Sequence, residues 1–118
     1  MTDRFSAELM RGSLDLMVLS VLMQGPQYGY SMQQQLREAT RGRAPLPAGT
    51  LYPLLHRLET EKLIRSRWDE STGRRRKWYE ITKTGRARLG SQANQWLAYA
   101  ECIRTLLNAV PELRPAAT

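Results

Sequence analysis

The chain has 118 residues, 42% of them hydrophobic and 25% charged, which is typical of one globular domain and unlike a disordered chain. Eighteen Lys and Arg residues against eleven Asp and Glu give a net charge of +7, which attracts polyanions, with nucleic acid as the leading class of partner. No apolar run is long enough to span a bilayer and the N-terminus lacks the apolar segment of a signal peptide, so we expect no membrane association and a cytoplasmic location.

The first predicted element is a long helix over about residues 6–24, which Gly25 and Pro26 end. Its apolar residues recur at spacings of three and four and form two stripes. One stripe consists of Met10, Leu14, Met17, Val18, Val21 and Leu22, and the other of Leu16, Leu19 and Met23. Because a helix that is apolar on two faces is usually buried on two sides, we expect it to pack against both its own domain and a partner chain.

Two shorter helices follow in the prediction. Ser31 is the expected cap of the first, and Thr50 is the expected cap of the second, which runs to about Lys62. Pro53 would then be the third helical residue, where its missing N–H costs nothing. The alternative, a start near Pro47, would require a kink at Pro53.

The third helix has two contrasting faces. Its inner face is expected to consist of Leu51, Leu54, Leu55 and Leu58. Tyr52 and His56 project almost opposite, so the two short helices are typical of a helix-turn-helix motif. Four residues are expected to face the major groove of DNA, namely Thr50, Tyr52, His56 and Arg57. The alternative is an ordinary exposed surface, with Tyr52 packed under the domain and His56 free of contacts.

Residues 63–68 and 76–81 are predicted strands, and the turn-forming residues 69–73 join them into a β-hairpin. A hairpin that follows a helix-turn-helix motif is a wing. Four adjacent cations lie at its tip and on its returning strand, namely Arg74, Arg75, Arg76 and Lys77. They are expected to bind the phosphates of one DNA strand, with a simple solvated charge run as the alternative.

A last helix is predicted from its cap, Thr82, to Asn108 or Val110. A heptad seam runs along it through Leu89, Ala93, Trp96, Ala100, Ile103, Leu107 and Val110. At about 42 Å, a helix of this length projects beyond the domain and is expected to pair in a homodimer. The chain is therefore divided into a DNA-binding domain (1–82), a dimerisation helix (83–110) and a flexible tail (111–118).

Trp96 stands on this seam between the small residues Ala93 and Ala100. Its bulk could hold the paired helices apart and line a site for a planar aromatic effector. The alternative is a filled interface in which the indoles pack on the alanines.

Catalytic constellations are absent from the sequence. It has one His, one Cys, no glycine-rich phosphate loop and no spacing typical of metal ligands. Cys102 lies off the heptad seam and is expected to be a structural thiol. We therefore expect no enzyme, no cofactor and no metal site.

Four motifs, in order, resemble the PadR family of transcriptional regulators over about residues 9–88. They are RGSLDL at 11–16, GPxYGY at 25–30, GTLYPLLxRLE at 49–59 followed by Leu63 and Ile64, and RRRKWYxITxxG at 74–85.

The resemblance implies a mainly α fold with a small β-hairpin, in which a winged helix-turn-helix carries a long C-terminal dimerisation helix. It implies a homodimeric regulator of a nearby promoter, usually a repressor on a palindromic operator, released by a small molecule or another cue. The groove-entering helix would be residues 50–58 and the wing residues 68–79. Some compact members bind flat aromatic compounds through a tryptophan of the last helix, and Trp96 is similarly placed. A non-specific nucleic-acid-binding module and a protein-interaction winged helix remain the alternatives.

Overall fold

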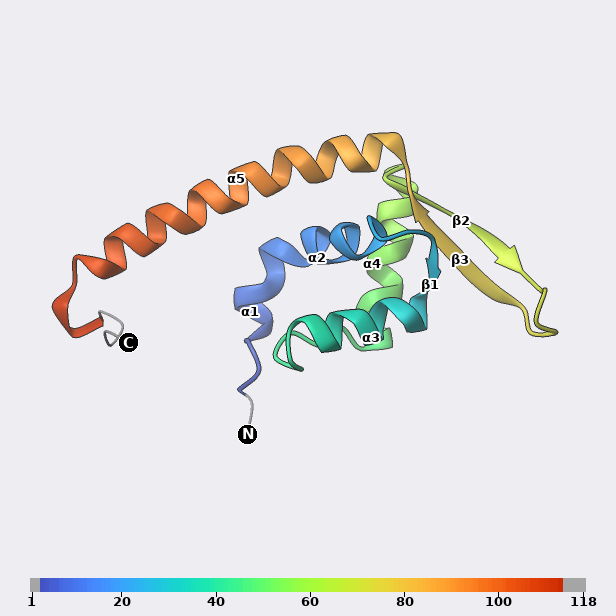
Figure 1. The fold of residues 1–118 in the computed structure, drawn as a ribbon, viewed down its shortest axis with the longest axis horizontal. Helices are drawn as coiled ribbons and strands as arrows, with labels where there is room; N and C mark the ends of the chain where they lie inside the picture. Colours follow the sequence, from blue (N-terminus) through green and yellow to red (C-terminus); the bar gives the residue numbers. More distant parts are fainter. Residues whose placement is uncertain (1–2, 114–118) are drawn as a thin grey trace.

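The computed structural model describes residues 3–113, which form a small helical body with a sheet at one end and a long helix along one side (Figure 1). In chain order the elements are α1 (Ala7–Met10), η1 (Arg11–Ser13), α2 (Leu14–Leu22), β1 (Gln27–Tyr28), α3 (Gly29–Ala39), α4 (Ala48–Thr60), β2 (Ile64–Asp69), β3 (Arg76–Ile81), α5 (Lys83–Asn108) and η2 (Pro111–Leu113). The predicted fold class, mainly α with a wing and a long last helix, is confirmed. Residues 114–118 of the predicted tail lie outside the described residues.

The first predicted helix is divided into three pieces. Ser6 caps α1 by accepting a hydrogen bond from the N–H of Leu9, and the chain then tightens into the 3₁₀ turn η1 around Gly12. Glycine favours a break because it loses more conformational freedom in a helix than any other residue. The hydroxyl of Ser13 donates to the carbonyl of Met10 at 3.1 Å, which stabilises the turn. Only α2 contributes fully buried side chains to the core.

The predicted caps of the two short helices, Ser31 and Thr50, are wrong, and for α4 the alternative start near Pro47 is confirmed. α3 begins at Gly29, and the hydroxyl of Ser31 donates to the side chain of Gln27 instead. α4 begins at Ala48 because Pro47, with φ −64° and ψ 162°, already has the extended conformation of an N-cap residue. Pro53 therefore lies inside the helix, where it leaves the exposed carbonyl of Gly49 without its usual N–H donor.

The sheet has three antiparallel strands in the order β1-β3-β2. The predicted hairpin is confirmed, with Ile64 opposite Ile81 and Asp69 opposite Arg76. The short strand β1 was not predicted, and it pairs with β3 on the side away from β2. The buried side chain of Gln27 fixes β1 to the body, since its amide donates to the carbonyl of Val21 at 3.0 Å.

One hydrophobic core joins α2, α3, α4 and the sheet. It consists of Val18, Leu19, Val21, Leu22, Met32, Leu36, Leu46, Leu51, Leu54, Leu55, Leu58, Leu63, Ile64, Tyr79 and Ile81. The four leucines of α4 were all predicted to face inward, and this is confirmed. By burying these residues, the core fixes the orientation of α4 relative to the wing.

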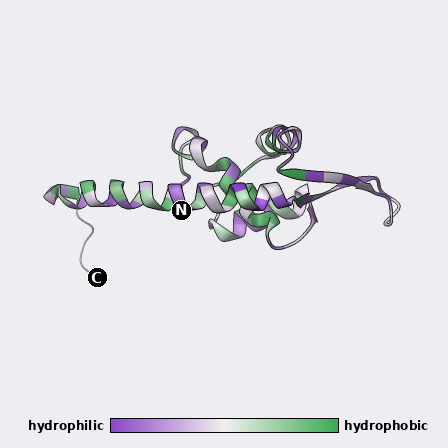
Figure 2. Cartoon of the chain, turned by 90° about the horizontal axis from the view of Figure 1, so that it is seen from above, coloured by the Kyte–Doolittle hydropathy of each residue, from purple (hydrophilic) through white to green (hydrophobic). Residues whose placement is uncertain are grey.

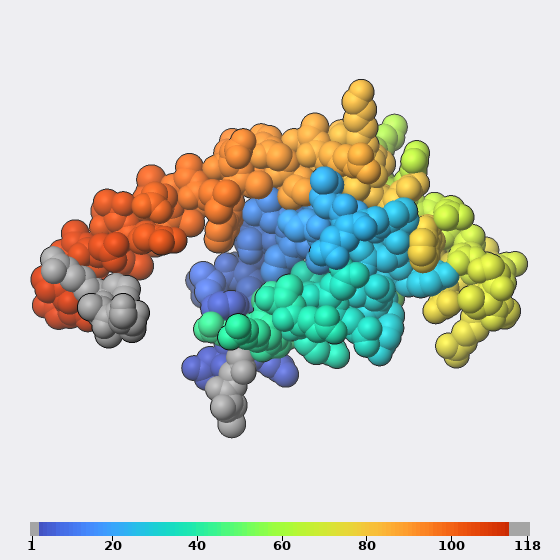
Figure 3. Space-filling view, in the orientation of Figure 1, coloured from blue at the N-terminus to red at the C-terminus, as the bar shows by residue number. Residues whose placement is uncertain are grey.

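The long helix α5 begins as predicted, because Thr82 accepts a hydrogen bond from the N–H of Gly85 at 3.0 Å. Gly85 is buried against the backbone of Leu63, in a space that no Cβ atom could share. Beyond its first turns α5 leaves the body, and Figures 2 and 3 show its C-terminal half standing clear of the other helices. Its exposed apolar side chains include Trp96, Leu97, Tyr99, Ile103, Leu106 and Leu107, and Val110, just beyond its end, is also exposed. No helix in the described residues is long and apolar enough to cross a membrane.

Candidate nucleic-acid interface

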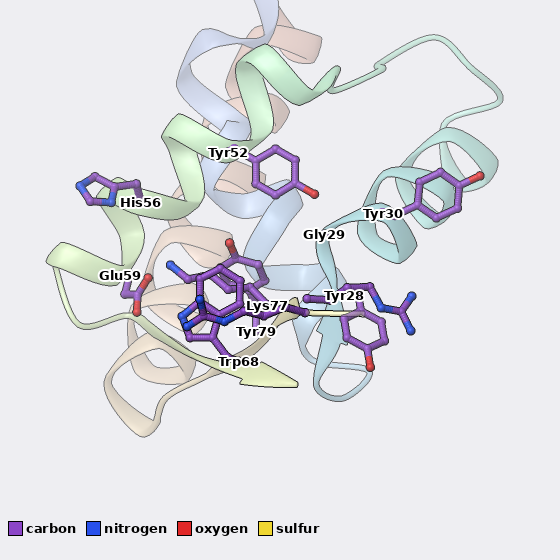
Figure 4. A pocket seen from close by; sticks show the side chains of 11 residues that line it. Tyr28, Gly29, Tyr30, Tyr52, His56, Glu59, Trp68, Lys77 and Tyr79 are labelled. Atoms are coloured by element: carbon purple, nitrogen blue, oxygen red, sulfur yellow. The ribbon is translucent and has the colours of Figure 1, made fainter. Parts of the chain in front are cut away.

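An open cleft of about 530 Å³ lies between the outer side of α4, the start of α3 and the wing (Figure 4). Its walls are formed by Tyr28, Gly29, Tyr30, Tyr52, His56, Glu59, Trp68, Arg75, Arg76, Lys77 and Tyr79. Two of the four predicted residues of α4 and three of the four predicted wing cations line it. Tyr28, Tyr30, Glu59 and Trp68 were not predicted to belong to the site.

Tyr52 is held in the cleft by a close approach to Gly29. A Cβ atom at residue 29 would lie 2.5 Å from the phenol oxygen of Tyr52, so only glycine leaves room for this ring. The side chain points from α4 toward Gly29 in Figure 4, and the residue remains 43% exposed. Tyr79 lies deeper in the cleft, where burial, with lesser effects of Tyr52 and Glu59, raises its pKa. Tyr52 is therefore fixed by packing and still accessible to a ligand.

The four cations of the wing differ in their surroundings. The guanidinium of Arg75 stacks 4.1 Å from the ring centre of Trp68 and lies 3.5 Å from Glu70, and the ammonium of Lys77 lies 5.4 Å from the same ring. Such cation–π contacts restrict the side chains while leaving the positive charge available. Arg74 makes no ion pair or side-chain hydrogen bond with any other described residue.

Arg76 belongs to a second cluster, which ties the wing to β1. Its guanidinium lies 4.1 Å from the ring centre of Tyr28, and that ring packs edge-on against Trp78 at 4.5 Å. The phenol of Tyr28 donates a short hydrogen bond to Asp69. This bond, with hydrogen bonds from Ser71, lowers the pKa of Asp69 to about 2. The same bond to Asp69 raises the pKa of Tyr28. A single carboxylate therefore anchors both β1 and the turn of the wing.

An exposed helix beside a cationic hairpin is the arrangement that binds duplex DNA in winged helix-turn-helix proteins. The profile of the transcriptional regulator PadR-like family matches residues 18–91, which is more than half of the chain. The chain belongs to this family.

Similar curated and solved proteins are transcriptional regulators, and one of them is named as a PadR family member. Transcriptional regulator Rv3488 of Mycobacterium tuberculosis is 35% identical over 82 residues, which cover 70% of this chain and 74% of that protein. A PadR family regulator from Eggerthella lenta is 38% identical, with a TM-score of 0.76 over 85% of this chain and 86% of its own. A transcriptional regulator from Clostridium thermocellum reaches a TM-score of 0.78 at 30% identity, covering 84% and 97% of the two chains.

Two of the four residues that were predicted on α4, Thr50 and Arg57, lie outside the cleft. Successive residues of an α-helix are about 100° apart, so Thr50 and Arg57 lie about 160° and 140° from Tyr52 around the axis. Thr50 is exposed, whereas the guanidinium of Arg57 binds Asp15 at 2.5 Å and Glu61 at 2.8 Å. Arg57 therefore does not lie on the side of α4 that Tyr52 presents to the cleft.

Arg57 instead lines a second cleft, of about 420 Å³, which lies between η1, the start of α2, α4 and α5. Its other lining residues are Arg11, Gly12, Asp15, Leu16, Gln92, Gln95, Trp96 and Tyr99. Trp96 is 45% exposed. Among the described residues no three His, Cys, Asp or Glu side chains are grouped so that they could hold a metal ion.

Proposed function

We propose that this PadR-like chain is a repressor that binds a palindromic operator in double-stranded DNA as a homodimer. The observation that carries the proposal is the cleft, because it joins the exposed side of α4 to the cationic wing in one continuous surface. α4 enters the major groove and the wing follows the neighbouring phosphates. The chain acts in the cytoplasm and catalyses no reaction.

The side chains divide into two roles. Tyr52 and His56 reach base edges, since a phenol and an imidazole can each donate or accept a hydrogen bond there. Thr50 lies in the first turn of α4, where the hydroxyl and the helix N-terminus favour a phosphate. The cations Arg74, Arg75, Arg76 and Lys77 neutralise backbone phosphates, which supplies affinity without sequence preference.

The dimer forms through α5 with support from α1. The exposed apolar side chains of α5 continue along its free half, and Leu9 of α1 is also 68% exposed. A second copy of the chain is the partner that covers both, because the heptad seam is self-complementary under two-fold symmetry. Residues 1–82 then act as the DNA-binding part and residues 83–110 as the dimerisation helix.

Trp96 is proposed to bind a planar aromatic effector at the dimer interface. The second cleft opens beside this indole, and its seam neighbours Ala93 and Ala100 are small. An effector releases the operator only if it binds more tightly to a dimer geometry that no longer fits DNA. Planar aromatic dyes should quench tryptophan emission saturably, and Trp96→Ala should abolish this. Equal dye binding by both proteins would contradict the effector role.

The experiment that tests the main proposal is a binding assay on the DNA just upstream of the chain's own gene, with random DNA as competitor. Retention of this segment at a large excess of random DNA is expected. Equal affinity for random duplex or for RNA would favour the non-specific module, and indifference to charge reversal of the wing would favour the protein-interaction module. Sedimentation at low micromolar concentration should give about twice the chain mass of 13.6 kDa.

A further inference from the structure

Arg57 is the centre of a chain of four charged side chains that crosses three helices. Its guanidinium contacts Asp15 of α2 at 2.5 Å and Glu61, directly after α4, at 2.8 Å. Glu61 in turn lies 3.8 Å from Arg88 of α5. The ion-pair chain Asp15–Arg57–Glu61–Arg88 therefore links the recognition helix to both helices that flank the second cleft.

The geometry of Arg57 is specific to a guanidinium. Both terminal nitrogens donate to Asp15, Nη2 at 2.5 Å and Nη1 at 3.5 Å, and Nη1 also donates to Glu61, so the planar fork bridges two carboxylates. These hydrogen bonds raise the pKa of Arg57, with Asp15 as the larger cause. A lysine offers one compact charge and cannot reproduce this bridge. The guanidinium of Arg57 is thus held by two carboxylates of the protein itself, on the same side of α4 as Thr50 and away from Tyr52.

The position of Glu61 also indicates a requirement for these contacts. It follows the last turn of α4, where the helix dipole disfavours a carboxylate. Two cations from different helices offset this cost, namely Arg57 and Arg88. The carboxylate thus connects the C-terminal end of α4 to α5, with the nearest nitrogen of Arg88 at 3.8 Å.

We propose that Arg57 is a positioning residue, which sets the orientation of α4 against α2 and α5 through this ion-pair chain without contacting DNA. The inference rests on the proposed function, because the spacing of two recognition helices matters only in a dimer on DNA. Two half-sites lie about one helical turn, roughly 34 Å, apart, and small rotations of α4 change the fit at both. Arg57 thereby determines which half-site spacing the dimer accepts.

The test uses the full chain and a duplex selected by that chain from a random-sequence pool, with a random duplex of equal length for comparison. Asp15→Asn removes a negative charge, so electrostatics alone would tighten DNA binding. The proposal predicts the opposite, a loss of about threefold to tenfold on the selected duplex with no loss on the random one. Arg57→Lys, at unchanged net charge, should give the same loss. Glu38→Gln is the matched control, an exposed carboxylate on α3 outside the ion-pair chain.

A second measurement separates positioning from a general effect on folding. Each variant is tested on selected duplexes whose half-site spacing is changed by one base pair, and its melting temperature is recorded. Folded Asp15→Asn, Glu61→Gln and Arg57→Lys chains should discriminate less between spacings than the parent chain, whereas Glu38→Gln should match the parent. If Asp15→Asn fails to fold, Arg57→Lys and Glu61→Gln decide the outcome.

Three results overturn the inference. One is selected-duplex binding by Asp15→Asn as tight as that of the parent. Another is a fall of about two in the slope of log K against log salt concentration for the Arg57→Ala dimer, together with normal binding by Arg57→Lys. That combination would identify a contact between Arg57 and a phosphate. In both cases the proposed function stands. If the parent chain selects no preferred duplex, the proposed function and the inference fail together.

Discussion

Arg74 offers the cleanest test of the wing, because its replacement removes a charge and disturbs no other described side chain. We predict that Arg74→Ala weakens binding to every duplex. In a dimer the substitution removes two phosphate contacts, each worth about 0.9 in the slope of log K against log salt concentration. The slope should therefore fall by about 1.8. If the parent and Arg74→Ala chains bind equally at 1 M salt, a slope lower by about 1.8 makes the variant bind about 60-fold more weakly at 0.1 M salt.

The assay is equilibrium binding of the selected and the random duplex at four or more salt concentrations. Arg86→Ala is the matched control, since Arg86 is an exposed arginine on the first turns of α5 outside the cleft. It should leave the slope nearly unchanged. The ratio of affinities for the two duplexes should survive in Arg74→Ala, because phosphate contacts carry no sequence information. An unchanged slope in Arg74→Ala would refute the assignment of the wing to phosphates.

Three further predictions concern contacts within the protein, two of packing and one of a hydrogen bond. Gly29→Ala should displace the ring of Tyr52 and weaken binding to the selected duplex several-fold, while the melting temperature stays close to that of the parent. Equal binding by the variant and the parent would show that this ring does not contact DNA. Gly85→Ala should lower the free energy of unfolding by about 1 to 3 kcal/mol, because a methyl group there collides with backbone, and an unchanged chemical denaturation midpoint would disprove that contact. Tyr28→Phe should raise the pKa of Asp69 from about 2 toward 3.8, as followed by carboxyl NMR. Because the pKa of Asp69 is lowered in the folded protein, the anchoring by Asp69 is present above pH 3.8 and is lost as the pH falls toward 2. If the pKa of Asp69 stayed near 2 in Tyr28→Phe, the phenol would not be the cause of the lowered pKa.

The elements with strong local signals were predictable from sequence. The hairpin follows from turn-forming residues between two strand-like runs, and the structure pairs β2 with β3 as expected. α5 follows from the cap Thr82 and a long apolar repeat. β1 carries no comparable signal, because a strand of two residues has no periodicity and forms only by pairing with β3. The cap at Thr50 was wrong because Pro47 already provides the extended residue that α4 requires.

The candidate site was predictable where sequence neighbours act together and not where distant segments meet. Four consecutive cations identify the wing without a structure, whereas Tyr28 and Tyr30 join the cleft only through the tertiary fold. The contact between Arg57 and Asp15 was not predictable for the same reason. Asp15 lies 42 positions away from Arg57 in the chain, and no local pattern reveals that contact.

The most direct test of the central claim compares three duplexes of equal length: the selected palindrome, the same site with one half scrambled, and random sequence. Their affinities for the full chain are measured by competition at physiological salt. A dimer that reads both half-sites through α4 should bind the palindrome at least about 10³-fold more tightly than random DNA, and should lose most of that preference when one half is scrambled. Equal affinity for all three duplexes would contradict the account.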